Sequence, residues 1–333
     1  MRHTTWIKLA GAVLAVAIGA PAFAQTPVKF ALNYQVNEAH IAYWVALEKG
    51  YYKSKGLDVV IEYSKGSGDA ISKADAGRAD VALADAMAVV PALARGAKVK
   101  IIGMVMDKSP LNIFVWDDSP IKTPKDLEGK TLAAPPGDAQ RVLFKAFAES
   151  VGVDSSKVSW LNVDPAAKVP ALVGKRVDGV GTYYTDLPMF EKGMGKGKVR
   201  SMRWSDFNFD PYSISIIANE QTIRSKPDML KAFLEASYMG WRDALANMDE
   251  AITIFKKRVP ELDQPVARAA MPMVYDLLAS KRYEEHGIGW IDQQKMCRTV
   301  NLVNGNMDLP RKPSCEEVYT SALLPVVKPV QSR

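Results

Sequence analysis

The chain has 333 residues, a formal net charge of +6 at pH 7, two cysteines and three histidines. Its 43 basic and 37 acidic residues are dispersed without a basic run, which indicates a solvated surface and argues against nucleic-acid binding. A zinc site needs three or four clustered nitrogen or sulfur ligands, and the spacing of the histidines and cysteines offers no such cluster. We therefore expect neither a metal nor another cofactor.

Residues 1–24 have the pattern of a secretory signal peptide. A basic region precedes a short apolar run at residues 9–20, and Ala22-Phe23-Ala24 fits a small-residue cleavage site. The apolar run is shorter than the roughly 20 residues that span a membrane, and no cysteine stands directly after it to carry a lipid. We expect export, cleavage after Ala24, and a mature chain of residues 25–333 with a charge of +4, long enough for two domains.

Residues 28–63 predict a βαβ unit. Residues 28–32 form an apolar run typical of a buried strand, residues 39–49 carry apolar side chains at helical spacing, and residues 57–63 alternate as a second strand. We expect the two strands to be parallel, with a right-handed crossover. Because ligands of open α/β sheets bind beyond the carboxyl ends of the strands, the loop after the first strand is a candidate binding segment. Its candidate residues are Tyr34, Gln35 and Asn37.

Strands and helices alternate along the next part of the chain, and long helices follow. We predict strands at residues 81–83, 99–106, 111–116, 131–134, 158–163, 178–183, 199–204 and 213–218. The strands 111–116 and 213–218 resemble each other, and the simplest topology makes them the crossings between two lobes. We therefore expect lobe one at residues 25–115 and 216–333, where the C-terminal helices pack on it, and lobe two at residues 116–215.

Two loops at the starts of helices occupy equivalent places in the two lobes. They are Gly66-Ser67-Gly68-Asp69 and Pro136-Gly137-Asp138. Free backbone N–H groups and the helix dipole make such points anion or carbonyl sites, although Ser and Asp there are also ordinary caps. Capping explains either loop alone, but the matched pair favours contact with a ligand trapped between the lobes.

Aromatic side chains gather near the proposed loops. They are Tyr34, Tyr183, Tyr184, Phe207, Phe209 and Tyr212. Such side chains stack on planar ligand rings and offer hydroxyl hydrogen bonds. We expect half of them to be core packing instead, Phe209 and Phe207 among them, and the polar run at residues 182–186 to be the stronger candidate.

His40 stands at the start of the first predicted helix. It is either a hydrogen-bond donor at the cleft or a partly buried structural histidine, and the nearby sequence shows no nucleophile for it to activate. The enzyme signatures GxSxG, HExxH and CxxC are missing from the chain.

The cysteines, Cys297 and Cys315, lie near the C-terminus. An exported chain meets an oxidising compartment, so they form either a disulfide that ties down the tail or two buried thiols. The sequence leaves both alternatives open.

Several segments together carry a family resemblance. They are VNEAHIAYWVALEKGYYKSKGLDVVI, GSGDAISKADAGRADVALADA, SPIKTPKDLEGKTLAAPPG, ALVGKRVDGVGTYYTDLP and DPYSISIIANEQTIRSKPDMLKAFLEASYMGW. In this order, over about residues 28–325, they resemble the solute-binding proteins of the nitrate, sulfonate and thiamine-pyrimidine ABC importers. The resemblance implies a type II periplasmic-binding-protein fold, in which two α/β lobes joined by a two-strand hinge close on a small molecule.

The same resemblance implies a periplasmic, monomeric binding protein rather than an enzyme, which delivers its ligand to an inner-membrane permease with its ATPase. Together with the loops above, it gives a candidate site with one wall from each lobe. Lobe one supplies Tyr34, Gln35, Asn37, His40, Gly68, Asp69 and Asp85. Lobe two supplies Gly137, Asp138, Gln140, Tyr183, Tyr184 and Asp186.

For the ligand, the resemblance favours a small planar heterocycle or aromatic carboxylate. Asn37 and His40 match the hydroxymethylpyrimidine-binding branch, but Tyr184 and Leu187 stand where that branch has acids, which favours a neutral or anionic planar ligand. An alkylsulfonate, taurine or nitrate is the alternative within the same fold.

Two further functions stay open at this point. One is an exported enzyme acting on a pyrimidine-like compound, with His40 as general base. The family's pyrimidine synthase has a cysteine-rich motif in mid-chain, and no cysteine precedes Cys297 here. The other is a periplasmic carrier for a sensor, which would share the binding chemistry and differ only in its partner.

Overall fold

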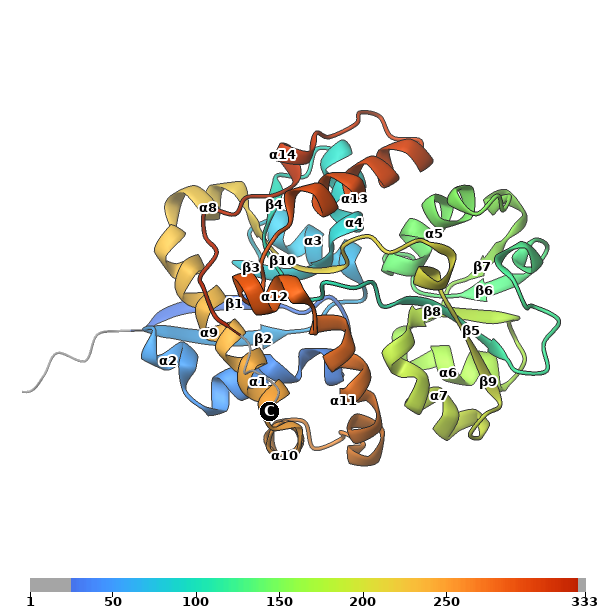
Figure 1. Cartoon of the computed structure of the whole chain (residues 1–333), viewed down its shortest axis with the longest axis horizontal. Coiled ribbons are helices and arrows are strands. Elements are labelled where there is room, and N and C mark those ends of the chain that lie inside the picture. The colour runs from blue at the N-terminus through green and yellow to red at the C-terminus, as the bar shows by residue number, and fades with distance from the viewer. Residues whose placement is uncertain (1–24, 329–333) are drawn as a thin grey trace, which may run out of the picture.

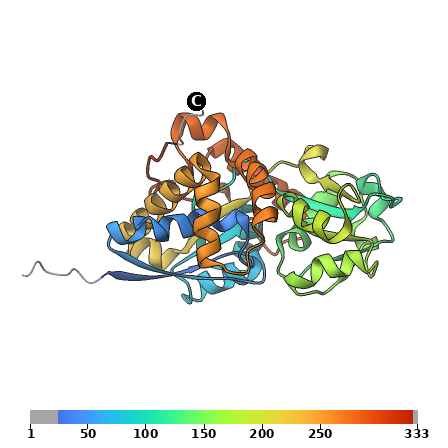
Figure 2. The same cartoon turned by 90° about the horizontal axis from the view of Figure 1, so that it is seen from below.

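The computed structural model describes residues 25–328, so the predicted signal peptide and its cleavage site lie outside the described residues. Two five-stranded sheets form two lobes that lie side by side in Figure 1 and, from below, in Figure 2. In lobe one the strands lie in the order β2 (Leu57–Glu62), β1 (Thr26–Ala31), β3 (Val81–Asp85), β10 (Ile214–Asn219) and β4 (Val99–Met104). In lobe two the order is β7 (Ser159–Leu161), β6 (Thr131–Ala133), β8 (Gly179–Tyr183), β5 (Leu111–Trp116) and β9 (Val199–Arg203).

The helices are divided unequally between the lobes. The N-terminal helices of lobe one are α1 (Ile41–Glu48), α2 (Tyr51–Ser54), α3 (Ser67–Asp75) and α4 (Ala86–Ala94). Lobe two has α5 (Ala139–Ser150), α6 (Lys168–Val173) and α7 (Leu187–Met194). The C-terminal helices are α8 (Glu220–Ser225), α9 (Pro227–Ala246), α10 (Met248–Arg258), α11 (Gln264–Leu278), α12 (Lys281–His286), α13 (Gln293–Asn306) and α14 (Cys315–Val318).

The two sheets have the same strand topology. In lobe one, β1 pairs in parallel with β2 and β3, which confirms the predicted βαβ unit, and β10 runs antiparallel between β3 and β4. In lobe two, β6 pairs in parallel with β7 and β8, and β5 runs antiparallel between β8 and β9. The mixed α/β class and the two-lobed fold predicted from the sequence are confirmed.

The strands expected to cross between the lobes each lie within one sheet. β5 is paired along its whole length with β8 and β9, and β10 with β3 and β4. A strand that is hydrogen-bonded to a neighbour on each side within one sheet is part of that lobe and is not the connection between the lobes. The chain therefore passes between the lobes at residues 105–110 and 204–213, and we propose lobe boundaries a few residues before the expected 115 and 215.

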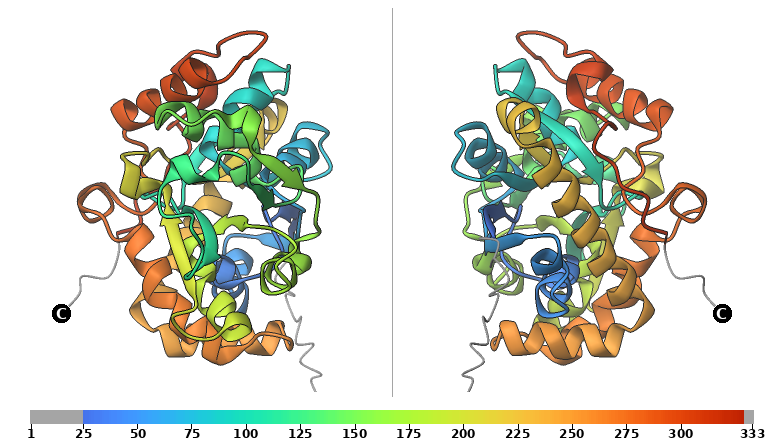
Figure 3. Two further views of the ribbon diagram at one scale, coloured as in Figure 1. Left: turned by 90° about the vertical axis from the view of Figure 1, so that its right-hand side faces the viewer. Right: turned by 90° about the vertical axis from the view of Figure 1, so that its left-hand side faces the viewer.

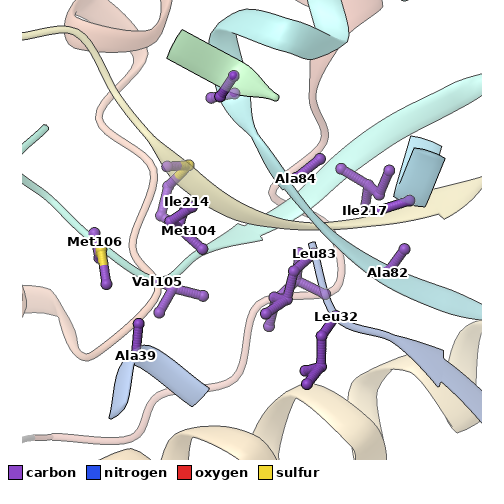
Figure 4. Close-up of a cluster of buried hydrophobic side chains, with 14 of the residues drawn as sticks. Leu32, Ala39, Ala82, Leu83, Ala84, Met104, Val105, Met106, Ile214 and Ile217 are labelled. Atoms are coloured by element: carbon purple, nitrogen blue, oxygen red, sulfur yellow. The ribbon is translucent and has the colours of Figure 1, made fainter. Parts of the chain in front are cut away.

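The core of lobe one packs around the strands β1, β3, β10 and β4. Figure 4 shows Leu32, Leu83, Met104 and Ile217 gathered there, and all four are fully buried. Burial of each such side chain contributes about 1.5–3 kcal/mol relative to its exposure. Apolar residues therefore hold together strands that are far apart in the sequence.

The long helix α9 covers one face of lobe one, where it is the gold helix in the right-hand view of Figure 3. It packs closely on α1, because a Cβ at Gly240 would lie 2.2 Å from the carbonyl oxygen of Ala42. Only a glycine allows the two helix backbones to approach this closely. The contact fixes α1, and with it the loop after β1 that faces lobe two.

Cys297 and Cys315 form a disulfide, which settles the alternative that the sequence left open. The bond joins α13 to α14, and a β-bridge between Ile101 and Tyr319 ties the following segment to β4. The C-terminal segment is thus anchored to lobe one at two points. Within residues 25–328, no helix has both the length and the apolar character that a membrane span requires.

Candidate functional site

The two glycine loops predicted to face each other touch directly. The N–H of Gly68 in lobe one donates a hydrogen bond to the carbonyl oxygen of Gly137 in lobe two, at 3.0 Å. A Cβ at Gly66, whose φ is +138°, would lie 2.4 Å from that same oxygen. The lobes are therefore closed on each other, and the absence of a side chain at Gly66 allows the contact.

Next to this contact lies a small polar cavity between the lobes, which we call the inner cavity. Its volume of about 10 Å³ is enough for one water molecule. It is lined by Asn33, Tyr34, Gly66, Ser67, Asp138, Ala139, Gln140, Lys168, Thr182, Tyr183 and Asp186.

A buried ion pair lies in the wall of the inner cavity. Lys168 Nζ donates to Asp138 Oδ2 at 2.7 Å, and the two side chains are only 3% and 4% exposed. The other carboxylate oxygen of Asp138 accepts from the backbone N–H of Gln140 and caps α5. The ammonium of Lys168 also lies 4.8 Å from the ring centre of Tyr34. The positive charge of Lys168 is thus already paired with groups of the protein itself.

A second carboxylate, that of Asp186, brings excess negative charge to the cavity. It accepts a hydrogen bond from the hydroxyl of Thr182, and burial raises its pKa above the usual value. The nearby Asp138 raises this pKa further, whereas Lys168 lowers it. With one lysine and two aspartates in its wall, the inner cavity offers hydrogen-bond acceptors to a ligand.

A chain of hydrogen bonds starts behind the cavity in lobe one and crosses to lobe two in the cavity wall. The N–H of Asn37 donates to His40 Nδ1 at 3.2 Å, so the ring proton is on Nε2, which lies 3.0 Å from Asn33 Oδ1. The amide of Asn33 then donates to the phenol oxygen of Tyr183 at 3.1 Å. Burial lowers the pKa of His40 to about 3, so the ring is neutral and acts as a positioning group.

Asp85 lies behind the cavity rather than in its wall. It caps α4 by accepting from the N–H of Met87, and its second oxygen accepts from the hydroxyl of Ser213 at 2.6 Å. Its own N–H donates to the hydroxyl of Ser67, which does line the cavity. Burial raises the pKa of Asp85 to about 6.

A larger space opens beside the inner cavity, and we call it the outer chamber. Its volume is about 400 Å³, within the range of small-molecule sites. Tyr34, Lys168, Thr182 and Asp186 line both spaces, so the two are continuous. The other lining residues are Gln35, Val36, Asn37, Glu38, Pro165, Ala166, Val169, Thr185, Met189, Lys192, Val259, Glu261, Leu262, Asp263 and Val266.

All candidate ligand-binding residues from the sequence except Tyr184 are thus distributed over four places. Five line the inner cavity: Tyr34, Asp138, Gln140, Tyr183 and Asp186. Gln35 and Asn37 line the outer chamber, together with Tyr34 and Asp186, whereas His40 and Asp85 lie behind the inner cavity. Gly68, Asp69 and Gly137 lie at the contact between the lobes, where Asp69 and Gly137 border a separate surface groove.

Tyr184 points away from both spaces. Its hydroxyl donates to the carbonyl oxygen of Met273 in α11, and the guanidinium of Arg203 lies 5.5 Å from its ring centre. Phe209 packs edge-on against Phe147 and belongs to the core, as expected.

Sequence reasoning missed Asn33 and Lys168, which both line the inner cavity, whereas Thr182, which also lines it, belongs to the polar run that was singled out. A signal for Lys168 was present, because it is the one charged residue in the apolar run Ala166 to Val173. A lysine that is buried in such a run requires a charged partner. The partner, Asp138, could not be read from the sequence.

Two α/β lobes that close over a chamber at the ends of their strands define the periplasmic-binding-protein fold. The structure is similar to that of the aliphatic sulphonate binding protein SsuA from Escherichia coli, with a TM-score of 0.67 and 16% identity over 92% of this chain and 96% of that one. The chain belongs to the NMT1/THI5-like family, whose profile matches residues 37–251.

Two curated relatives match nearly the whole chain. The riboflavin-binding protein RibY of Chloroflexus aurantiacus is 25% identical over 90% of this chain and 86% of its own length. The formylaminopyrimidine-binding protein of Halalkalibacterium halodurans is 24% identical over 88% of this chain and 89% of its own.

Proposed function

We propose that the protein is the periplasmic binding component of an ABC importer, which captures a small planar nitrogen heterocycle by closure of its two lobes. The ligand lies in the outer chamber, with one polar edge toward the inner cavity. Closure of lobes about their connections is the general mechanism of such binding proteins. The relatives named for binding riboflavin and formylaminopyrimidine support a heterocycle as the ligand class.

The observation that carries this proposal is the pair of carboxylates in the wall of the inner cavity, one of which, that of Asp186, also lines the outer chamber. The carboxylates of Asp138 and Asp186 accept hydrogen bonds from N–H groups, which ring nitrogens and amino substituents of heterocycles supply. Tyr34 adds an aromatic face next to them. These groups together recognise a flat compound with hydrogen-bond donors on its edge.

The same groups disfavour a sulfonate, taurine or nitrate. An anion in the inner cavity would face Asp138 and Asp186, and the cation in its wall, Lys168, is already paired with Asp138. The neutral or anionic planar ligand that the sequence suggested rested in part on Tyr184, whose hydroxyl bonds to α11 and which lines neither space.

The arrangement of His40 favours a binding protein over an enzyme. Both of its ring nitrogens are engaged with groups of lobe one, and burial lowers its pKa to about 3. A general base for a reaction near neutral pH needs a free nitrogen and a pKa close to 7. His40 instead orients Asn33 and, through it, Tyr183.

We further propose that cleavage after Ala24 releases a monomer into the periplasm, and that the closed lobes present the ligand to an inner-membrane permease with its ATPase. The basic and apolar regions of residues 1–24 support the export. The SsuA-like fold and the family support an ABC permease with its ATPase as the partner.

A thermal-shift screen of the mature protein tests the proposed ligand class. The panel contains aminopyrimidines, flavins, aromatic acids, alkylsulfonates, taurine and nitrate, and mass spectrometry of the recovered compound checks for turnover. A ligand at 100 times its Kd stabilises the folded state by about 2.7 kcal/mol. We expect nitrogen heterocycles to raise Tm and to be recovered unchanged. Stabilisation by sulfonates or nitrate alone, or conversion of a heterocycle, would refute the proposal.

A further inference from the structure

The outer chamber is larger than the space that a planar ring against the inner cavity would fill. Its remaining walls carry apolar and acidic side chains. Apolar side chains from both lobes form its walls, among them Val36, Val169, Met189 and Leu262. Met189 on α7 is 42% exposed, so its side chain is accessible to a ligand in the chamber. These walls suit the methylene groups of a substituent that extends from the ring.

The charged groups of the chamber are predominantly acidic. Glu38, Asp186, Glu261 and Asp263 line it together with two lysines, Lys168 and Lys192. Each lysine is already paired with an aspartate: Lys168 with Asp138 in the inner cavity, and Lys192 with Asp263 across the two lobes. Among residues 25–328, neither Glu38 nor Glu261 has an ion-pair partner within 4.0 Å.

Glu38 is the acidic residue best placed to contact a substituent on the ring of the ligand. It begins the short 3₁₀ turn Glu38–His40, is half-buried, and lies in the chamber on the lobe-one side. Burial raises the pKa of Glu38 to about 7, and the nearby carboxylates of Asp186 and Asp263 contribute to this rise. The same burial and the same carboxylates would oppose any further negative charge.

We propose that the outer chamber selects heterocycles whose substituent is a neutral or cationic hydrogen-bond donor, and that Glu38 excludes the phosphorylated forms of the same compounds. A hydroxyl or ammonium group donates to a carboxyl oxygen of Glu38, whereas a phosphate monoester would bring its charge among four acidic residues, of which Asp263 is paired with Lys192. Like charges that face each other in a binding site cost several kcal/mol. The protein thus binds a free alcohol or amine and rejects its phosphate ester.

This inference rests on the proposed function and deepens it. Isothermal titration tests it with two matched pairs of probes: riboflavin and riboflavin 5′-phosphate, and 4-amino-5-hydroxymethyl-2-methylpyrimidine and its phosphate. Within the pair that binds, we expect the phosphate ester to bind more than about tenfold more weakly than the alcohol. In the variant Glu38→Gln, the difference in affinity between the alcohol and its ester should be several-fold smaller, chiefly because the ester binds more tightly.

Glu149→Gln is the matched control, since it removes the same charge from the exposed surface of α5, away from both spaces. It should leave the gap unchanged, and circular dichroism should show that both variants fold. An ester that binds as well as its alcohol, or a gap that Glu38→Gln does not narrow, would overturn the inference and leave the proposed function intact. Failure of all four probes to bind would overturn the proposed function and this inference with it.

Discussion

The phenol oxygen of Tyr183, at the end of β8 in lobe two, accepts a hydrogen bond from the amide of Asn33 in lobe one over 3.1 Å. Both side chains are buried, and His40 fixes the direction of the bond by accepting from Asn37 N–H and facing Asn33 with its other ring nitrogen. A direct polar link therefore joins the lobes at the wall of the inner cavity. This link stabilises the closed state in addition to any contact that a ligand makes.

Replacement of this phenol should weaken ligand binding. Tyr183→Phe removes the bond between the lobes and leaves the Asn33 amide buried without that partner, which costs about 1–3 kcal/mol. We expect Kd to rise roughly tenfold in isothermal titration with a heterocycle that the wild type binds. Tyr52→Phe is the control, because it removes a buried bond to Ser237 within lobe one, and its Kd should match that of the wild type.

A methyl group at Gly66 should prevent full closure. The added Cβ would lie 2.4 Å from the carbonyl oxygen of Gly137, so Gly66→Ala holds the lobes apart and should weaken ligand binding by at least about tenfold. Small-angle scattering should show the loss of ligand-induced contraction. Gly152→Ala also places alanine at a positive φ, but into open space, and should contract normally. Equal contraction of both variants would contradict this role for Gly66.

The buried ion pair should show strong coupling between its two members. Lys168→Met leaves the carboxylates of Asp138 and Asp186 without their cation, and we expect the free energy of unfolding in urea to fall by roughly 3–5 kcal/mol. The double variant Lys168→Met/Asp138→Asn removes the stranded charge, while the amide oxygen of the new side chain still caps α5, so it should recover much of this loss. Simple additivity of the two substitutions would refute the coupling.

The carboxyl of Asp85 should make the folded state more stable as the pH falls. Its pKa is raised to about 6 in the folded protein, against 3.8 when exposed, so the folded state binds the proton more readily. This contribution is therefore present at low pH and is lost as the pH rises through about 6. Asp85→Asn keeps the cap of α4 and removes the titration.

Urea unfolding at several pH values measures this effect. Between pH 8 and pH 5 the wild type should gain about 1.4 kcal/mol of stability relative to Asp85→Asn. Parallel profiles of the two proteins would show that the carboxyl is not perturbed.

The disulfide should stabilise the C-terminal segment. Cys297 and Cys315 are separated by 18 residues, and closing a loop of that length contributes about 3 kcal/mol in the chain-entropy description. We expect a Cys297→Ser/Cys315→Ser variant to unfold at lower urea concentration by a corresponding amount. Reduction of the wild type should reproduce the change, and it should have no effect on the double variant.

Local patterns in the sequence predict most of the elements and the loops of the site. The alternation at residues 57–63 and the helical spacing at residues 39–49 depend only on neighbouring residues, and β2 and α1 form at these places. The rule that ligands bind beyond the carboxyl ends of strands pointed to Tyr34, and the matched loops at helix starts pointed to Asp138; both residues line the inner cavity.

The direction of individual side chains could not be predicted in this way. Tyr183 and Tyr184 are adjacent in the sequence, but Tyr183 ends β8 and Tyr184 begins a 3₁₀ turn, so one lines the inner cavity and the other contacts α11. Consecutive side chains at a strand end point to opposite sides. The pairing of Lys168 with Asp138 likewise depends on the tertiary fold, which brings the first residue of α6 to the N-cap of α5, and local spacing does not show this.

The position of β10 limits the order in which the two lobes can be completed as the chain becomes available from its N-terminus. β10 lies between β3 and β4 and pairs with both, although it follows them in the chain by the whole of lobe two. All strands of lobe two lie between Leu111 and Arg203, so that sheet can form as soon as this segment has been made. The sheet of lobe one lacks the strand between β3 and β4 until the chain up to Asn219 is available to fold, and the lobe that begins first is therefore completed last.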